Sequence, residues 1–299
     1  MGDLKLFRVS EHQTEELHGQ SMTIEKSLQQ LFERNLEQLL GIRFVASEYS
    51  TGRTHGGRID TLGLDENNSP VIIEYKRSTN ENVINQGLYY LDWLLDHQAE
   101  FELSILNQYG KEISNMIDWS NPRLVCIAGG FTKYDQHAVK QINRNIELYQ
   151  YKYYDTGLLL LDLVNATTAK PVVGTAEIGN TSKTVSDYLK QATRESKDLF
   201  DSVVTYLMSL GDDVQENVTK HYIAYKRIKN FACVEFHPST QKILMYVKVD
   251  PDTVVLEQGF TRDMRGIGHF GTGDLEIVIY TSDDFEKAKP HIQVSYEAN

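Results

Sequence analysis

The sequence has little that would mark a secreted or membrane protein. It contains 2 cysteines and 6 prolines, and Cys126 and Cys233 lie far apart in apolar surroundings. Buried free thiols are therefore expected, rather than a disulfide framework. No apolar run approaches the roughly eighteen residues of a membrane span. The polar start "MGDLKLFRVSEHQTEELHG" lacks the apolar centre of a signal peptide. We expect a cytoplasmic protein that does not insert into a membrane.

Positive charge is also scarce. The chain has 30 Lys and Arg residues against 42 Asp and Glu residues, which gives a net charge of -12 at pH 7. This balance argues against broad, nonspecific coating of nucleic acid. It does not exclude a nuclease, because a metal-dependent active site is itself acidic. A local basic patch can still hold phosphates, and "STGRTHGGR" supplies Arg53, His55 and Arg58 without an acid.

The front of the chain alternates between helical and strand patterns. Apolar residues at helical spacing predict a helix over 23–41 that stops at Gly41. Turn-forming "DENNS" separates two expected strands. The further expected elements are a strand over 42–51, a loop over 52–57, strands over 58–64 and 70–76, one or two helices over 80–110, a strand over 122–131, a helix from 137 towards 154, and a strand over 157–164. This order predicts an α/β domain whose mixed central sheet is flanked by helices.

The composition changes after residue 165. Residues 166–189 are small and polar, which is typical of a linker. A helix over 184–211 and strands over 231–237, 242–249 and 275–281 predict a smaller α+β domain. We therefore expect domains at 1–165 and 190–299. In "AYKRIKNFACVEF", basic residues alternate with aromatics, as in surfaces that bind single strands. A helix end with solvated Lys and Arg, leading into a core strand, is the favoured interpretation.

The stretch "RIDTLGLDENNSPVIIEYK" places acids and a lysine in an expected hairpin. Glu74 and Lys76 are two residues apart and share one face of their strand. If Asp60 lies opposite or diagonal to Glu74, all three project to the same side. An ordinary cross-strand salt bridge with a surface aspartate explains these residues about as well as an active site does.

The active-site interpretation has a definite chemistry. Two carboxylates on neighbouring strands can ligate Mg²⁺ or Mn²⁺, with water and substrate phosphate completing the shell. The metal lowers the pKa of bound water and stabilises charge on phosphoryl oxygens. Lys76 would position the nucleophile or stabilise the developing charge.

Two flanking helices favour that interpretation. Gln86 and Tyr90 are four residues apart on one helix face and can act together. In the first helix, Glu33 and Glu37 border the apolar stripe, and Glu33 lies nearer to it. A glutamate at this border can lean over the sheet and add a carboxylate to the metal shell, although a solvated helix flank is the simpler explanation for either residue.

The ordered set resembles the PD-(D/E)xK nuclease superfamily. The matching residues are Glu33 in "ERNLEQLLG", Asp60 in "RID", Glu74 and Lys76 in "EYK", and Gln86 and Tyr90 in "QGLYY". The likeness covers roughly residues 20 to 165 and is nearest to the branch with RecB-type and archaeal mismatch-endonuclease domains. Ile59 stands where the superfamily has a proline. The resemblance implies a restriction-endonuclease-like fold. The C-terminal segment looks like a domain of uncharacterised function that accompanies such nucleases.

The leading hypothesis is a nuclease that uses Mg²⁺ or Mn²⁺, with DNA as the expected substrate. Asp60, Glu74 and Glu33 would hold the metal or its water, Lys76 would act on the nucleophile, Gln86 and Tyr90 would order the site, and Arg53, Arg58 and Arg77 would contact phosphates. The alternative is a nucleic-acid- or protein-binding adaptor on the same scaffold, without catalysis. A homodimer patch made of Tyr89, Tyr90 and Trp93 also stays open, as does core packing of these rings.

Overall fold

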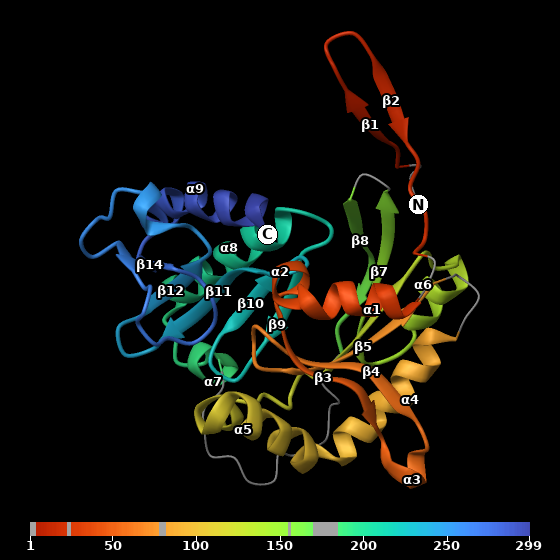
Figure 1. The fold of residues 1–299 in the computed structure, drawn as a ribbon. Coiled ribbons are helices and arrows are strands. Elements are labelled where there is room, and N and C mark those ends of the chain that lie inside the picture. Colours follow the sequence, from red (N-terminus) through yellow and green to blue (C-terminus); the bar gives the residue numbers. More distant parts are fainter. Residues whose placement is uncertain (1–3, 23–24, 78–81, 155–156, 170–184) are drawn as a thin grey trace.

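The computed structural model describes residues 4–22, 25–77, 82–154, 157–169 and 185–299 (Figure 1). These residues form a front α/β part, a back α+β part and a projecting N-terminal hairpin. Among them, no helix combines the length and the apolar content that crossing a bilayer would require. The helices and sheets of the front and back parts confirm the predicted fold class.

The front part is built on a mixed sheet whose described strands run in the order β3-β4-β5-β6-β7-β8. The β5–β6 and β6–β7 pairs are parallel and the other pairs are antiparallel. The strands are β3 (Ile42–Ser50), β4 (Arg58–Asp65), β5 (Pro70–Lys76), β6 (Arg123–Ala128), β7 (Asn145–Tyr154) and β8 (Leu158–Thr167). β5 and β6 are buried along almost their whole length, as expected for central strands covered on both faces.

Helices cover both faces of this sheet. On one face, Leu28 and Phe32 of α1 (Glu25–Arg34) and Leu36 of α2 (Leu36–Leu40) pack on Ile73 and Tyr75 of β5. The other face is covered by α4 (Val83–Asp96), α5 (Gln98–Asn115) and α6 (Lys133–Val139). α3 (Gly52–His55) is a short helix between β3 and β4. α1 and α4 therefore approach the β4–β5 hairpin from opposite faces.

The back part is an antiparallel sheet with helices on one face. Its described strands follow the order β13-β14-β12-β11-β10-β9, with β9 (Gln215–Val218), β10 (Ile223–Lys226), β11 (Asn230–His237), β12 (Lys242–Val247), β13 (Thr261–Asp263) and β14 (Leu275–Ile279). The helical elements are α7 (Val185–Leu189), α8 (Arg194–Ser209), the 3-10 turn η1 (Pro251–Thr253) and α9 (Ser282–Ala298). Phe200, Val203 and Phe285 anchor α8 and α9 in the sheet's core.

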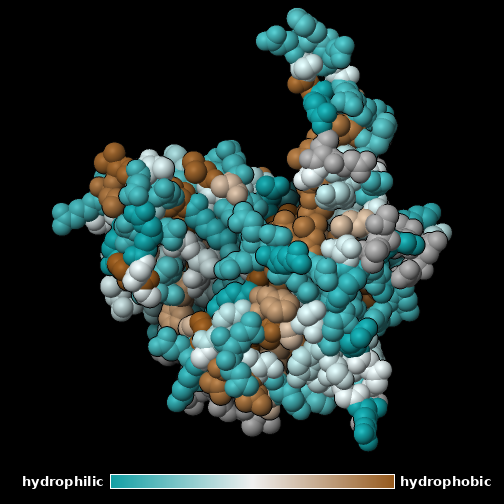
Figure 2. Space-filling model, in the orientation of Figure 1, coloured by the Kyte–Doolittle hydropathy of each residue, from teal (hydrophilic) through white to brown (hydrophobic). Residues whose placement is uncertain are grey.

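The N-terminal hairpin consists of β1 (Leu6–Val9) and β2 (Thr14–Leu17) and projects away from the body (Figure 1). It joins the front part through a bridge between Gln20 and Tyr153. Polar side chains dominate its surface (Figure 2). The sequence pattern did not indicate this hairpin, because its two strands are short and show no clear alternation of apolar and polar residues.

Several expected elements have different limits in the structure. The predicted helix over 23–41 breaks at Asn35, whose φ of -130° is not helical, and ends at Gly41 in the left-handed region with φ 64°. The expected loop over 52–57 contains α3. The helix expected from 137 ends at Val139, and "NIELYQYKYY" forms β7 because its alternate residues fill the two opposite cores. Of the expected linker, residues 170–184 lie outside the described residues.

Buried charges join the front and back parts. Lys226 of β10 is 5% exposed and donates to Glu147 Oε1 at 2.6 Å. Arg123 donates to the same oxygen at 2.6 Å, and its Nε lies 3.2 Å from Asp65 Oδ2. The favoured interpretation of "AYKRIKN" as a helix end with solvated basic residues was therefore wrong for Lys226. It lies in a strand, where the charge is neutralised by a glutamate of the other domain.

Candidate active site at the open end of the β4–β5 hairpin

The β4–β5 ladder ends at the pair formed by Thr61 and Ile73. Beyond this pair, carboxylate oxygens replace backbone carbonyls as the acceptors of the hydrogen bonds between the two strands. Tyr75 N donates to Asp60 Oδ2 at 3.0 Å, and Asp60 N donates to Glu74 Oε1 at 3.2 Å. Each carboxylate thus holds the backbone of the opposite strand. The register assumed from the sequence is present, and Asp60 and Glu74 converge where the two strands separate.

Burial and mutual repulsion make this pair electrostatically unfavourable without a cation. Glu74 is completely buried, beside Cys126 of β6. Burial, with the nearby charge of Asp60, raises the pKa of Glu74 to about 9. Burial also raises the pKa of Asp60, against the backbone N–H of Tyr75 and the charge of Lys76. Glu74 Oε2 is buried and has no hydrogen-bond partner among the described residues. A proton or a divalent cation would satisfy this oxygen.

Lys76 lies at the end of β5 and forms an ion pair that the sequence did not predict. Its Nζ is 3.2 Å from Glu25 Oε1 in the first turn of α1, and its side chain is only 14% exposed. The charge of Glu25 contributes to the raised pKa values of Asp60 and Glu74, so this carboxylate belongs to the same cluster of charges.

Glu33 lies two helical turns further along α1. Its Oε1 accepts hydrogen bonds from Thr61 Oγ1 at 2.7 Å and from Gln29 Nε2 at 2.9 Å. Gln29 Nε2 also donates to the backbone carbonyl of Asp60 at 2.7 Å. Glu25, Gln29 and Glu33 are spaced by four residues and share one flank. Extending that flank by two turns towards the N-terminus would have revealed Glu25.

The Gln86–Tyr90 pair on α4 is present and touches the hairpin. Gln86 Nε2 donates to Tyr90 Oη at 3.4 Å, and Tyr90 Oη accepts from Arg58 N at 3.2 Å. A Cβ atom at Gly57 would lie 2.5 Å from the Tyr90 ring, so the close packing requires glycine there. Tyr90 therefore fixes the backbone two residues before Asp60.

The three arginines proposed to contact phosphate are all exposed near this end of the sheet. Arg53 lies on α3, and Arg77 follows Lys76. Arg58 forms an ion pair with Glu48, which also accepts from Lys26 at 2.7 Å. The acid-free stretch around α3 is thus partly neutralised by an acid from β3.

Among the described residues, no group of three or more His, Cys, Asp or Glu side chains is arranged to hold a metal ion. Asp60 and Glu74 are the convergent pair. One or two carboxylates with waters and substrate phosphates are a usual shell for Mg²⁺. The unpartnered Glu74 Oε2 and the raised pKa values fit such a cation.

The aromatic residues of α4 are mostly part of the core. Tyr90 and Trp93 are 6% and 4% exposed, whereas Tyr89 is 48% exposed. Tyr89 Oη donates to the backbone carbonyl of His55 in α3 at 2.9 Å. Core packing therefore accounts for Tyr90 and Trp93, and the three rings do not form a common exposed patch.

Comparison with known proteins extends over both parts of the chain. Residues 185–299 match a family described as "Domain of unknown function (DUF5655)". This match confirms that the C-terminal segment resembles a domain of uncharacterised function. The chain is also 29% identical over 298 residues to an uncharacterized protein of Haemophilus influenzae, which covers 95% of this chain and 96% of that protein.

Similar solved structures are named as a repair endonuclease and as EndoMS, and each matches over part of its length. One is a repair endonuclease from Pyrococcus abyssi, at 18% identity and a TM-score of 0.29 over 43% of this chain and 47% of that chain. Another is EndoMS in apo form, at 16% identity and a TM-score of 0.28 over 43% and 47% of the two chains. The chain spans about half the length of these structures.

Proposed function

We propose that this chain is a metal-dependent nuclease that hydrolyses phosphodiester bonds, with DNA as its substrate. The observation that carries the proposal is the convergence of Asp60 and Glu74 at the open end of the hairpin, beside Lys76. A fully buried carboxyl with one unpartnered oxygen, beside a second, half-buried carboxyl, is unfavourable for folding alone. The assignment of DNA rests on the resemblance of the ordered motifs to PD-(D/E)xK nucleases.

The residues present fit a divalent cation. Asp60 and Glu74 would hold Mg²⁺ or Mn²⁺ through the oxygens that are not engaged with the backbone. Glu33 and Glu25, on one flank of α1, are the candidates for holding a metal-bound water. When bound, the metal would supply an activated water and stabilise charge on the scissile phosphate.

The protein's own side chains would divide the remaining work. Lys76 would orient the attacking water and stabilise negative charge on the phosphate, and its ion pair with Glu25 would hold the ammonium in place. The Gln86–Tyr90 pair would keep the Arg58 backbone, and hence Asp60, in position. Arg53, Arg58 and Arg77 would contact the phosphates of the substrate strand.

Cleavage assays test this proposal directly. Single-stranded, double-stranded and branched DNA, together with RNA, would be incubated with the protein and Mg²⁺ or Mn²⁺. We expect Asp60→Ala and Lys76→Ala each to lower the cleavage rate by roughly 1,000-fold, because each removes a group that stabilises transition-state charge. Failure of the wild-type protein to cut any of these substrates, or undiminished cutting by both variants, would refute the proposal.

A non-catalytic adaptor on the same scaffold is the second candidate. The observation that favours it is that the described residues hold no group of three metal-binding side chains. Calorimetric titration with Mn²⁺ separates the two candidates. An adaptor would bind DNA or protein without taking up Mn²⁺, whereas the nuclease would bind Mn²⁺ at a site that Asp60→Ala removes.

A further inference from the structure

β8 forms one edge of the front sheet, and among the described residues its only paired strand is β7. The register shifts between Leu148 and Tyr149 of β7, which leaves Val164 of β8 as an extra residue. Leu158–Leu163 is therefore the regularly paired part of this edge. Its sequence is "LLLLDL", with Asp162 as the one charged residue.

The other described edges of the two six-stranded sheets carry features that prevent pairing. β3 has a register shift between Phe44 and Ala46, and Glu48 has a φ of 54°. The Phe44 carbonyl accepts hydrogen bonds from Gln108 Nε2 at 2.9 Å and from Tyr109 Oη at 2.5 Å. In the back sheet, the edge strands β9 and β13 have only 4 and 3 residues. Bulges, covered carbonyls and short strands are the usual protections of an edge.

Leu158–Leu163 lacks these protections. It has one charge in a chain that is 24% charged, and it contains neither lysine nor proline. Leu158 is 48% exposed, and the next three leucines are half-buried. A regular, apolar edge of this kind pairs readily with strands of other chains. A protein that remained monomeric would thus carry a permanent site for aggregation, which a fixed partner strand removes.

We propose that this edge is the interface of a homodimer, in which β8 pairs antiparallel with β8 of a second copy. A partner strand pairs with all the outward backbone groups of an edge at once and also covers its apolar side chains, and β8 is the one long unprotected edge in the described residues. Two identical edges pair about a two-fold axis, so the same surface serves as both donor and acceptor. The front sheet then continues from one copy into the other.

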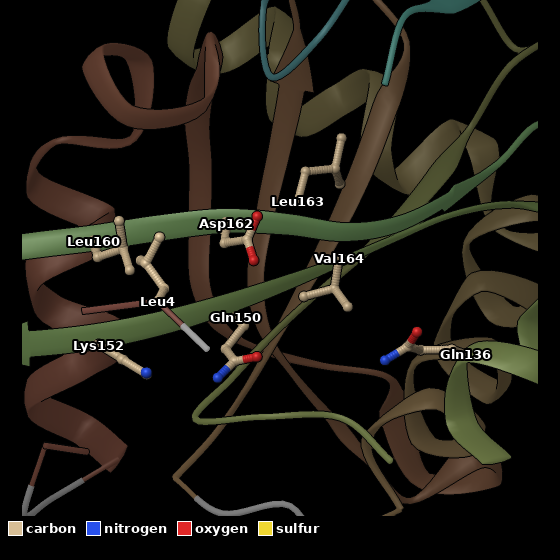
Figure 3. Close-up of a pocket in the computed structure, with 8 residues that line it drawn as sticks. All are labelled: Leu4, Gln136, Gln150, Lys152, Leu160, Asp162, Leu163 and Val164. Atoms are coloured by element: carbon tan, nitrogen blue, oxygen red, sulfur yellow. The ribbon is translucent and has the colours of Figure 1, made fainter. Parts of the chain in front are cut away.

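The charges near the edge select the register. Lys152 pairs with Leu160, and Gln150 pairs with Asp162. These residues line one hollow of about 320 Å³ on the sheet, together with Leu4 (Figure 3). A two-fold axis at Leu161 would place Leu160 opposite the partner's Asp162, with Lys152 one strand spacing of about 4.8 Å beyond. An axis at Asp162 would instead bring two like charges together.

Sedimentation equilibrium at micromolar concentration tests the dimer itself. We expect a mass of twice 34.2 kDa for the wild-type protein. This measurement is independent of nuclease activity, so the dimer and the proposed function can fail separately. A mass of 34.2 kDa throughout the micromolar range would overturn the inference.

Two substitutions of one residue test the register. Leu160→Glu would oppose the partner's Asp162 twice in each dimer, and we expect the dimer to dissociate roughly 100-fold more readily. Leu160→Lys also introduces a long charged side chain, but one of the opposite sign to that of Leu160→Glu, so we expect this variant to remain dimeric. Circular dichroism would verify that both variants are folded. Equal dimerisation of wild type and Leu160→Glu would contradict the proposed register.

Cross-linking provides a second test that does not depend on a destabilising charge. Leu161→Cys would place two thiols at the two-fold axis, and we expect oxidation to yield a covalent dimer. The native Cys126 and Cys233 are buried and would not interfere. Leu106→Cys, at an exposed position on α5, is the matched control. If Leu161→Cys forms no more covalent dimer than Leu106→Cys, the interface lies elsewhere.

Discussion

Glu74 is the residue at which burial and charge conflict most strongly. Its carboxyl is fully buried, one oxygen holds the Asp60 N–H, and the other has no partner among the described residues. A raised pKa means that the folded state binds a proton that the unfolded state releases. Without metal, the stability linked to this group is present below pH 4.5, its ordinary pKa, and is lost as the pH rises through about 9.

Substitution of Glu74 by glutamine separates stability from activity. Glutamine keeps an oxygen for the Asp60 N–H and removes the conflict of charge. In a chelating buffer at pH 8, we expect Glu74→Gln to raise the free energy of unfolding by on the order of 3 kcal/mol. Urea unfolding of both proteins, with EDTA present, provides the measurement. A Glu74→Gln variant that is less stable than the wild type would show that the carboxylate is a structural hydrogen-bonding group.

Two glutamates of α1 differ in what they contact. Glu25 holds Lys76, whereas Glu33 accepts from Thr61 and Gln29. We expect Glu25→Gln to lower DNA cleavage by roughly 10- to 100-fold, as when a partner of an active-site group is removed. Glu33→Gln, with its remaining acceptor oxygen, should lower it less. Single-turnover cleavage rates of the two variants provide the measurement, and thermal melting verifies that both are folded. A larger loss for Glu33→Gln than for Glu25→Gln would make Glu33 the functional carboxylate.

At the scale of single residues, the sequence predicted some of the contacts but not how the side chains would be held. Strand periodicity predicted that Asp60 and Glu74 meet, and helical spacing predicted that Gln86 and Tyr90 meet. Glu33 was expected beside the two carboxylates, but its Oε1 accepts from Thr61 and Gln29 instead. Glu25 lies on the same flank of α1 as Glu33, but its contact could not be predicted, because its partner, Lys76, is 51 residues away.

At the scale of elements, the β4–β5 hairpin connects the candidate site to the domain interface. Its open end carries Asp60 and Glu74, and its turn carries Asn67, which accepts from Tyr222 Oη at 3.0 Å and from Asn230 Nδ2 at 2.8 Å. The two ends lie roughly 17 Å apart, at about 3.4 Å per residue. The back domain thus supports the hairpin at the end remote from the carboxylates.

The buried charges around Glu147 give this interface a specific pH dependence. Burial alone would raise the pKa of Glu147, but Arg123 and Lys226 outweigh it and lower the pKa to about 2. The stability from this group is therefore present above pH 4.5 and is lost as the pH falls towards 2. Glu147→Gln would leave two buried cations short of a partner.

We expect Glu147→Gln to lower the free energy of unfolding at pH 7 by about 3–5 kcal/mol. Its stability should also fall less steeply than that of the wild type as the pH decreases from 4.5 towards 2. Urea unfolding across this range measures both effects. Equal stabilities at pH 7 would show that the ion cluster does not hold the two domains together.

The bounds of an element could be predicted where its sequence pattern was unambiguous. β5 has the predicted bounds, since its apolar run is bracketed by Pro70 and Lys76. β7 was expected as part of a helix. Its large apolar and aromatic residues face both sides of the sheet, so the sequence does not show the alternation of apolar and polar residues that marks a strand. β10 was not predicted, because a lysine is expected to be exposed to solvent. Lys226 can be buried only because it pairs with Glu147, which is distant in the sequence.

At the scale of the whole molecule, composition and order predicted two domains of the correct classes. The contacts between the domains could not be predicted, because they depend on buried polar pairs such as Asn67 with Asn230, which are 163 residues apart. The proposed β8 interface could not be predicted either, because only the strand order shows which strands lie at the edges of a sheet. With a net charge of -12, the proposed nuclease would have to bind substrate phosphates through a local group of basic residues.

The rate of DNA cleavage as a function of Mn²⁺ concentration, compared between wild type and Glu74→Gln, tests the central claim most directly. We expect the wild-type rate to rise with Mn²⁺ and saturate. We expect Glu74→Gln to be at least roughly 1,000-fold slower at every concentration, although it is the more stable protein without metal. Unfolding could not then explain its loss of activity. Equal rates for the two proteins, or wild-type cleavage that does not depend on Mn²⁺, would contradict the proposed active site.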